Sequence, residues 1–418
     1  MKASLLIHNI SHLYTQANEP PVRGKAMKDI VCLDDAFVAC DNDRIIGFGT
    51  GEFNDYVSNT TLLFDAKGLI LLPGLIDSHT HLVHGGSRED EFSLKIKGVS
   101  YFDILNRGGG ILSTVAKTRN ASFKELYDKA RESLDEMLLY GVTTIEAKSG
   151  YGLDLETEIK QLKVAKKLNH DHPIDIISTY LGAHAVPKEF LNRKQAFVSK
   201  VIQDLEIIKD KELARFVDVF CEEGVFGLEE TEAIIKRAKE LGFIPRLHAD
   251  EMHHLGGAGL GVDYEAASVD HLMAISDRDI EKLAHSKTIA NLLPATSFFL
   301  NKDYAPARKL IDKDAAVAIA SDYNPGSTPS ENFQLTMQLA GIKLRMDPKE
   351  ILTASTINPA YLLGIHNECG SIAIGKKADL VLFKAKNIDY LIYHYGINHT
   401  EHVFKNGRIV VKNRQLCY

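Results

Sequence analysis

Two histidines one residue apart follow an apolar run in the first quarter of the chain. The run extends from Leu69 to Ile76, and His79 and His81 come shortly after it. In an extended backbone, residues i and i+2 point to the same side, so both imidazoles face one point. Neutral imidazole is a common ligand for divalent metals. A run this apolar is typical of a strand buried on both faces, and ligands bind at the carboxyl ends of such strands. The spacing therefore predicts a metal site rather than a pair of surface histidines.

Two distant residues complete the predicted metal site. His248 and Asp322 each follow another short apolar run. Alone, His248 would more often be a hydrogen-bonded core residue, and Asp322 could be a helix N-cap. With His79 and His81 they form a mixed nitrogen and oxygen ligand set that suits one zinc or iron ion per chain. Such an ion lowers the pKa of water and makes hydroxide available as a nucleophile, and Asp322 could accept the proton of that water.

Two further polar residues are candidates for proton transfer and charge stabilisation. Glu251 lies three residues after His248, and a turn of the chain would return its carboxyl group to the same cavity. We predict that Glu251 carries a proton to a substrate nitrogen, although a surface acid in a turn fits its position equally well. His271 is predicted to stabilise a developing oxyanion. The alternatives for His271 are a fifth metal ligand or a core histidine.

The candidate residues follow short apolar runs that alternate with helical patterns. In the helix before the second run, Leu126, Ala130, Leu134 and Leu138 recur every four residues and form one apolar stripe. Eight such alternations predict an α/β protein with a (β/α)8 TIM-like barrel, whose chemistry lies at the carboxyl ends of its strands. The eight predicted strands are Leu69–Ile76, Val142–Ala147, Ile174–Leu181, Phe216–Phe220, Phe243–Leu247, Ala266–Val269, Thr288–Ala290 and Ala315–Ile319.

Both ends of the chain are rich in short β-type runs. Near the C-terminus, Val403 to Val411 contains an Asn-Gly pair and reads as a hairpin. Because isolated hairpins are only marginally stable, we expect the two ends to meet in one small β-sandwich module. The predicted module comprises residues 1–65 and 366–418, and the predicted barrel comprises residues 66–365.

Composition limits the function classes. The chain has 418 residues and a formal net charge of −7 at pH 7, which disfavours a nucleic-acid partner and favours a small-molecule substrate. The five cysteines are scattered and form no CxxC pair, so we expect neither a disulfide framework nor a cysteine zinc site, and a cytoplasmic location. No stretch resembles a signal peptide or approaches the roughly 18 apolar residues of a membrane span, so no membrane partner is expected.

Several ordered motifs extend beyond the metal ligands. The broad ones are the stretch from Pro73 to His81 and a tail from Gly370 to Leu382, and the narrower ones are His84–Arg88, Arg107–Ile111, Glu146–Gly152, Leu181–Pro187 and Ser321–Ser327. With His248 and Asp322, the broad motifs resemble the amidohydrolase superfamily. The ordered narrower set, over nearly the whole length, resembles the imidazolonepropionase family of histidine degradation.

The resemblance implies a reaction and assigns residues to it. It implies a hydrolase that opens the cyclic amide of 4-imidazolone-5-propanoate to N-formimidoyl-L-glutamate in histidine catabolism, usually as a homodimer. It maps the metal ligands to His79, His81, His248 and Asp322. It maps substrate contacts to Arg88, Tyr151, His184 and Glu251, and contacts with the polar end of the product to Asn324, Gly326 and Ser327.

The chemistry of the substrate agrees with two of these residues independently. The propionate needs a cation, and Arg88 offers a planar fork suited to a carboxylate, although a solvated loop charge is the commoner role of arginine. Tyr151 lies between two glycines, where its phenol could hydrogen-bond substrate or simply pack the loop. In related barrels a modified lysine can bridge two metals, but it lies near the fourth strand, where this chain has Cys221 and Glu222. We therefore expect one metal, and the role of Lys148 stays open.

Two other functions remain as alternatives. Residues 248–251 followed by His271 resemble an adenosine-deaminase-like arrangement, so a deaminase of a nitrogen heterocycle is the second hypothesis. Release of ammonia rather than ring opening would identify it. The third hypothesis is a catalytically silent scaffold, but such a chain is expected to lose metal ligands, and this sequence keeps all four.

Overall fold

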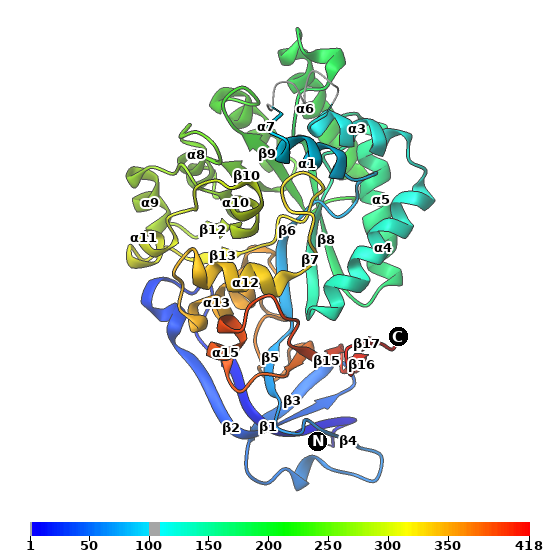
Figure 1. The fold of residues 1–418 in the computed structure, drawn as a ribbon, viewed down its shortest axis with the longest axis vertical. Helices are drawn as coiled ribbons and strands as arrows, with labels where there is room; N and C mark the ends of the chain where they lie inside the picture. The colour runs from blue at the N-terminus through cyan, green and yellow to red at the C-terminus, as the bar shows by residue number, and fades with distance from the viewer. Residues whose placement is uncertain (1, 100–108) are drawn as a thin grey trace.

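Eight parallel strands form the centre of the protein, for which the computed structural model describes residues 2–99 and 109–418 (Figure 1). They pair in sequence order, and a parallel bridge between Thr80 and Tyr323 joins the last strand region to the first. The backbone N–H of Asp322 also donates to the carbonyl of His79 at 3.0 Å. The predicted (β/α)8 barrel is therefore confirmed. Its strands are β6 (Leu75–Thr80), β7 (Val142–Lys148), β8 (Asp175–Ala183), β9 (Phe216–Cys221), β10 (Ile244–Ala249), β11 (Ser268–His271), β12 (Ile289–Leu292) and β13 (Val317–Ile319).

Helices surround the barrel (Figure 1). Apolar residues of these helices and of the barrel strands are buried in one core. The predicted stripe of α4 is buried, and the helix begins at a capping box in which Ser122 and Glu125 bond each other's backbone N–H. No helix in the described part of the chain combines the length and the apolar character that crossing a bilayer requires. The described helices are α1 (Glu89–Ile96), α3 (Ile111–Asn120), α4 (Phe123–Leu139), α5 (Leu155–Asp171), α6 (Lys194–Asp210), α7 (Leu228–Glu240), α8 (Gly257–Asp263), α9 (Asp277–Ala284), α10 (Pro294–Leu300), α11 (Ala307–Asp312), α12 (Phe333–Ile342), α13 (Pro348–Ser355), α14 (Ile357–Leu362) and α15 (Ile388–Tyr393).

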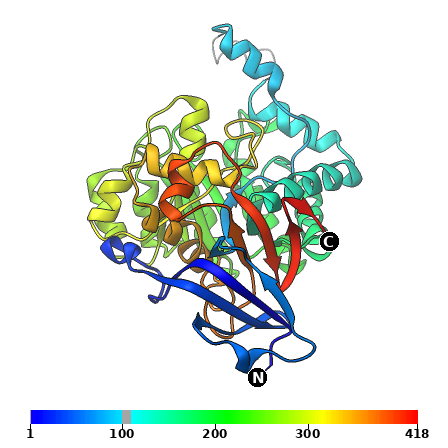
Figure 2. The ribbon, with the colours of Figure 1, turned by 60° about the horizontal axis from the view of Figure 1, so that its bottom comes forward.

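The two ends of the chain meet in one nine-stranded sheet below the barrel, as predicted (Figures 1 and 2). Blue N-terminal and red C-terminal strands share this sheet, and their side chains share one apolar core. The Asn406–Gly407 turn has positive φ at both residues, which a tight hairpin requires. The strands are β1 (Leu5–Gln16), β2 (Ile30–Asp41), β3 (Arg44–Thr50), β4 (Leu62–Asp65), β5 (Ile70–Pro73), β14 (Leu380–Phe383), β15 (Thr400–Lys405), β16 (Arg408–Lys412) and β17 (Gln415–Leu416).

The apolar run from Leu69 to Ile76 serves both sheets. It was predicted as one strand, but β5 pairs with β1 and β14 of the module, whereas β6 pairs with β7 of the barrel. The change occurs at Gly74, where a Cβ atom would lie 2.2 Å from Thr143 Oγ1, so only glycine allows this close approach. Burial on both sides of the change explains why the run is continuously apolar. The predicted domain boundaries at residues 65 and 366 stay a prediction.

Candidate metal centre and substrate cavity

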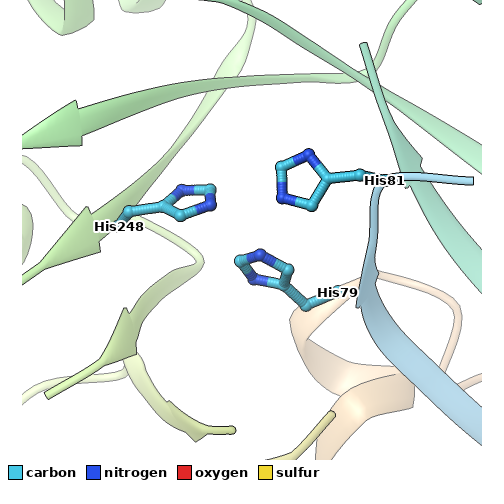
Figure 3. Close-up of side chains that lie close together, drawn as sticks. All are labelled: His79, His81 and His248. Atoms are coloured by element: carbon cyan, nitrogen blue, oxygen red, sulfur yellow. The ribbon is translucent and has the colours of Figure 1, made fainter. Parts of the chain in front are cut away.

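Three predicted ligands converge at the carboxyl end of the barrel (Figure 3). His79 and His81 extend from the end of β6, and His248 extends from β10 across the barrel. All three side chains are buried, and one ring nitrogen from each lies within 4.8 Å of the others. The i, i+2 spacing on a strand thus brings His79 and His81 to one face, as the sequence predicted.

Buried carboxylates fix the orientation of two of these rings. His79 Nδ1 hydrogen-bonds Asp270 Oδ2 at 2.5 Å, and His248 Nδ1 hydrogen-bonds Asp218 Oδ1 at 3.0 Å. Because a carboxylate accepts, each ring carries a proton on Nδ1, and Nε2 is the atom that a metal ion would bind. Both Nε2 atoms are buried without a hydrogen-bond partner, which is unusual for buried polar atoms. Two lone pairs aimed at one point fit a divalent metal.

Asp322 faces the same point. Its Oδ1 lies 3.5 Å from Nε2 of both His79 and His81, and its Oδ2 accepts hydrogen bonds from Thr296 Oγ1 at 2.7 Å and Ser327 Oγ at 3.1 Å. Burial raises the pKa of Asp322 to about 6. Its φ of 57° is in the left-handed region, which costs a non-glycine residue about 1–3 kcal/mol and is typical of functional sites. The structure therefore gathers the four predicted ligands, and the donor set fits zinc or iron.

A network of buried charges lies beneath the histidines. Lys148 Nζ pairs with Glu146 Oε1 at 2.8 Å and with Asp218 Oδ2 at 2.7 Å. Arg246 pairs with Asp270 Oδ2 at 2.7 Å and with Glu146 Oε1 at 3.1 Å. Each carboxylate that orients a histidine is therefore held by a buried cation, and both cations share Glu146. Lys148 is engaged in this network by two carboxylates.

Sequence reasoning missed most of this network. Asp218, Glu146 and Arg246 lie inside strands that were recognised only by their apolar neighbours. A usable signal was present, because Glu146 precedes Lys148 by two residues and Arg246 precedes His248 by two. Alternation along a strand places such pairs on one face, here the barrel interior.

Glu251 and His271 lie together beside the ligand group. Glu251 Oε2 is 3.6 Å from His271 Nε2. Burial, reinforced by the nearby charge of Asp322, raises the pKa of Glu251 to about 8. Burial holds the pKa of His271 well below its usual range, so this imidazole is neutral. His271 has a φ of 80°, a second strained residue at this end of the barrel.

Tyr151 and His184 lie on the other side of the ligand group. The His184 ring stacks on His81 with centroids 4.9 Å apart, and its Nδ1 hydrogen-bonds the carbonyl of Gly150 at 3.0 Å. Tyr151 is buried, with its ring centroid 5.6 Å from that of His81. The loop that carries Tyr151 is fixed by the Glu158 carboxylate, which accepts three backbone N–H groups at 2.8 Å each, from Gly150, Gly152 and Leu153.

A cavity of about 350 Å³ is lined by Arg88, Tyr323, Asn324 and Gly326 among others, so it borders the loop that follows Asp322. Asn324 acts within the loop itself. Its Oδ1 accepts the backbone N–H of Gly326 at 2.7 Å and of Ser327 at 2.9 Å, and its Nδ2 donates to Ser327 Oγ at 2.6 Å. The cavity thus brings Arg88 and the predicted product-binding loop together.

Arg107 and Gly108, part of one predicted motif, lie outside the described residues.

Comparisons with known proteins show which family the chain belongs to. A profile described as the amidohydrolase family matches residues 188–410. An imidazolonepropionase from Fusobacterium nucleatum subsp. nucleatum is 48% identical over 414 residues, covering 99% of this chain and 100% of the relative. An imidazolonepropionase from Bacillus cytotoxicus is 50% identical over 407 residues, covering 97% of this chain and 96% of the relative.

Solved structures share the fold at low sequence identity. An adenosine deaminase from Xanthomonas campestris with bound zinc superposes with a TM-score of 0.73 at 18% identity, covering 100% of this chain and 94% of that one. The E. coli guanine deaminase gives a TM-score of 0.74 at 14% identity, covering 97% and 99%. At these identities the likeness establishes the fold alone.

Proposed function

The chain belongs to the imidazolonepropionase family of amidohydrolases, and from this membership we propose that it hydrolyses 4-imidazolone-5-propanoate to N-formimidoyl-L-glutamate. One observation carries the proposal beyond family membership. One ring nitrogen from each of His79, His81 and His248 lies in a buried group, and Asp322 Oδ1 lies 3.5 Å from two of these histidines. Arg88 lines a cavity together with Tyr323 and Asn324, which directly follow Asp322 in the sequence. This pairs a hydrolytic centre with a cation for a short carboxylate side chain.

We propose that His79, His81, His248 and Asp322 hold one divalent ion, either zinc or iron. A bound divalent ion supplies hydroxide at neutral pH by lowering the pKa of water. Asp322 takes the proton of that water on its carboxylate. The oxygen of the water forms a bond to the ring carbonyl carbon, the carbon–nitrogen bond of the cyclic amide breaks, and the nitrogen leaves with a proton.

Glu251 is the proposed source of that proton. With its pKa raised to about 8, the carboxyl group is mostly protonated at neutral pH and can donate where an ordinary glutamate cannot. Neutral His271 is proposed to donate a hydrogen bond to the developing oxyanion. Arg88 binds the propionate, and Tyr151 and His184 contact the ring. The loop from Asn324 to Ser327 holds the polar end of the product.

The deaminase alternative is not favoured. Its support was a resemblance in residues 248–251 and 271, and the deaminases among the solved structures match at only 14–18% identity. The relatives that match at 48–50% over the whole chain are named imidazolonepropionase. A silent scaffold has no support, because the structure gathers all four predicted ligands.

Incubation of the purified chain with 4-imidazolone-5-propanoate tests the proposal. We expect loss of the ring chromophore, formation of N-formimidoyl-L-glutamate without ammonia, and about one zinc or iron per chain by elemental analysis. Release of ammonia would indicate a deaminase, and an unchanged substrate with no bound metal would indicate a scaffold.

Location and assembly belong to the same proposal. We propose a cytoplasmic homodimer that acts on a small molecule and needs neither membrane nor nucleic acid. The five free cysteines support a reducing compartment. Sedimentation of the purified chain tests the dimer.

A further inference from the structure

We propose that Glu91 is a positioning residue that fixes Arg88 so that one defined side of its guanidinium meets the substrate carboxylate. The inference rests on the proposed function and deepens it. No motif in the sequence pointed to Glu91, which lies in the first turn of α1.

Glu91 engages Arg88 through two donors. Its Oε2 accepts from Arg88 Nε at 2.9 Å and from Arg88 Nη2 at 2.8 Å, while its Oε1 accepts the backbone N–H of Gly110 at 3.1 Å. The side chains of Arg88 and Glu91 are only 13% and 11% exposed. Glu91 is thus tied to the start of α3 by one oxygen and to the guanidinium by the other, so neither side chain is a solvated surface charge.

Gly326 closes the opposite side of the guanidinium. A Cβ atom at Gly326 would lie 2.2 Å from Arg88 Nη1, so the backbone of the loop touches the donor that Glu91 does not engage. The Asn324 side chain holds this loop through its bonds to the N–H groups of Gly326 and Ser327. Arg88 is therefore fixed between α1 and the loop, and it lines the same cavity as Glu91 and Gly326.

This arrangement has two opposing electrostatic consequences. A free arginine loses much rotamer freedom when it binds a ligand, and fixing it beforehand removes that cost from binding. The Glu91 carboxylate also cancels the charge of Arg88, so it opposes the approach of an anion. The geometry assigns the larger effect to positioning, because Oε2 bonds the Nε and Nη2 edge and not Nη1, which faces Gly326 in the loop proposed to hold the polar end of the product.

The pairing also selects the class of anion. A neutralised Arg88–Glu91 pair attracts by directed hydrogen bonds more than by net charge, which suits a singly charged carboxylate better than a dianionic phosphate. Glu91 should therefore increase the affinity for a substrate with a short carboxylate arm, but not the affinity for the same ring without the arm.

Kinetics and binding of matched ligands test this role. In Glu91→Gln we expect KM for 4-imidazolone-5-propanoate to rise about fivefold to tenfold with kcat within about twofold, since the loss falls on ligand ordering. The dissociation constant for imidazole-4-propionate, measured by calorimetry, should rise equally, whereas that for 4-ethylimidazole should not change. Gly326→Ala, which displaces the guanidinium from the other side, should give the same pattern.

Asp90→Asn is the matched control. Asp90 is exposed, lies next to Glu91 on α1 and carries the same charge. Its replacement should leave the dissociation constants of both ligands unchanged. A lower KM in Glu91→Gln would make Glu91 a competitor of the substrate carboxylate and overturn the proposal. An equal rise in the dissociation constant of 4-ethylimidazole would show that Glu91 has only a general structural role. The calorimetric arm decides the inference even if the wild-type chain fails to open the ring, a failure that would count only against the proposed function.

Discussion

At the scale of single residues, the protons on Nδ1 of His79 and His248 determine which ring nitrogen a metal ion can bind. Asp270 and Asp218 each accept from Nδ1 of a histidine, so Nε2 of both rings is presented as a lone pair. Without these carboxylates either tautomer of each ring would be accessible. A ring with its proton on Nε2 could not offer a lone pair to a metal ion at that atom. Each histidine and the aspartate that orients it therefore both contribute to metal affinity, and the histidine contributes more because it binds the ion directly.

Removal of a histidine ligand should therefore lower metal affinity more than removal of the aspartate that orients it. His248→Ala should lower metal affinity by more than about 100-fold and abolish turnover, and Asp218→Asn should lower metal affinity by about 10- to 100-fold. Metal content per chain, measured during a titration with a chelator, gives both values. His170→Ala is the control, because His170 is exposed on α5. Retention of metal and turnover in His248→Ala would remove this histidine from the site.

The raised pKa of Glu251 predicts a limb in the pH profile. A carboxyl group with a pKa of about 8 is protonated below that pH and loses its proton above it. If the protonated form donates to the leaving nitrogen, kcat/KM should fall as the pH rises through this value. A divalent cation nearby lowers the pKa of adjacent acids, so the limb should lie at or below pH 8 in the loaded enzyme. The limb should vanish in Glu251→Gln, and a limb that persists there would belong to another group.

Single residues were predictable where type and spacing were both distinctive. His79 and His81 stood out because two imidazoles on one strand face have few structural uses. Glu91 and Asp218 did not stand out, because a carboxylate within a helix or strand gives no sign of the partner it will reach. That partner depends on how distant segments pack, which local patterns do not encode.

At the scale of elements, four strands of the barrel share one buried network of charges. β7, β9, β10 and β11 each contribute one or two charges to the network beneath the metal ligands. Removing one partner from a buried network leaves the others uncompensated, which costs much more than losing a surface pair. The strands that share this network, including β10 with His248, are therefore coupled in stability as well as in position.

Lys148→Met tests this coupling. The substitution removes the lysine that pairs with Asp218 and one of the two cations that pair with Glu146. We expect the free energy of unfolding to fall by about 3–5 kcal/mol, seen as a lower urea midpoint of the metal-free chain. Lys124→Met, which removes an exposed ion pair with Asp128 on α4, should leave the urea midpoint nearly unchanged. Equal effects of the two substitutions would contradict a coupled interior network.

Elements were predictable to within a few residues, with one instructive exception. The order and number of barrel strands followed from apolar runs, because parallel strands buried on both faces leave a continuous signal. The same continuity hid the division of residues 69–76 between two sheets. Gly74 was the only local sign, and its meaning depends on Thr143, nearly 70 residues away in the sequence.

At the scale of the whole molecule, a small group of ion pairs joins the module to the barrel. Asp175, at the start of β8, accepts from Lys377 at 2.9 Å and from Lys405 at 2.8 Å, and Lys405 also pairs with Asp379 at 2.6 Å. These contacts lie at the amino-terminal end of a barrel strand, whereas the ligands lie at the carboxyl ends. In such barrels the amino-terminal end serves stability and the carboxyl end serves chemistry.

Asp175→Asn separates these two contributions. Burial alone would raise the pKa of Asp175, but Lys405 and Lys377 hold it below the ordinary value of 3.8, so the folded state favours the charged carboxylate. A lowered pKa contributes stability that is complete above the ordinary value and is lost as the pH falls. The variant should therefore unfold at lower urea than the wild type by an equal margin from pH 5 to 8, about 1–2 kcal/mol because the side chain is one third exposed. That margin should shrink only below pH 3.8.

The activity of Asp175→Asn should be unaffected. Because Asp175 contacts no residue of the proposed site, kcat/KM and metal content should match the wild type at temperatures where both are folded. Asp263→Asn, which breaks an ion pair with Lys282 on the barrel surface, should change neither stability beyond about 1 kcal/mol nor activity. If Asp175→Asn instead lowered metal affinity, the module would influence the ligands through the length of β8, and the two ends of the barrel could not be treated as independent.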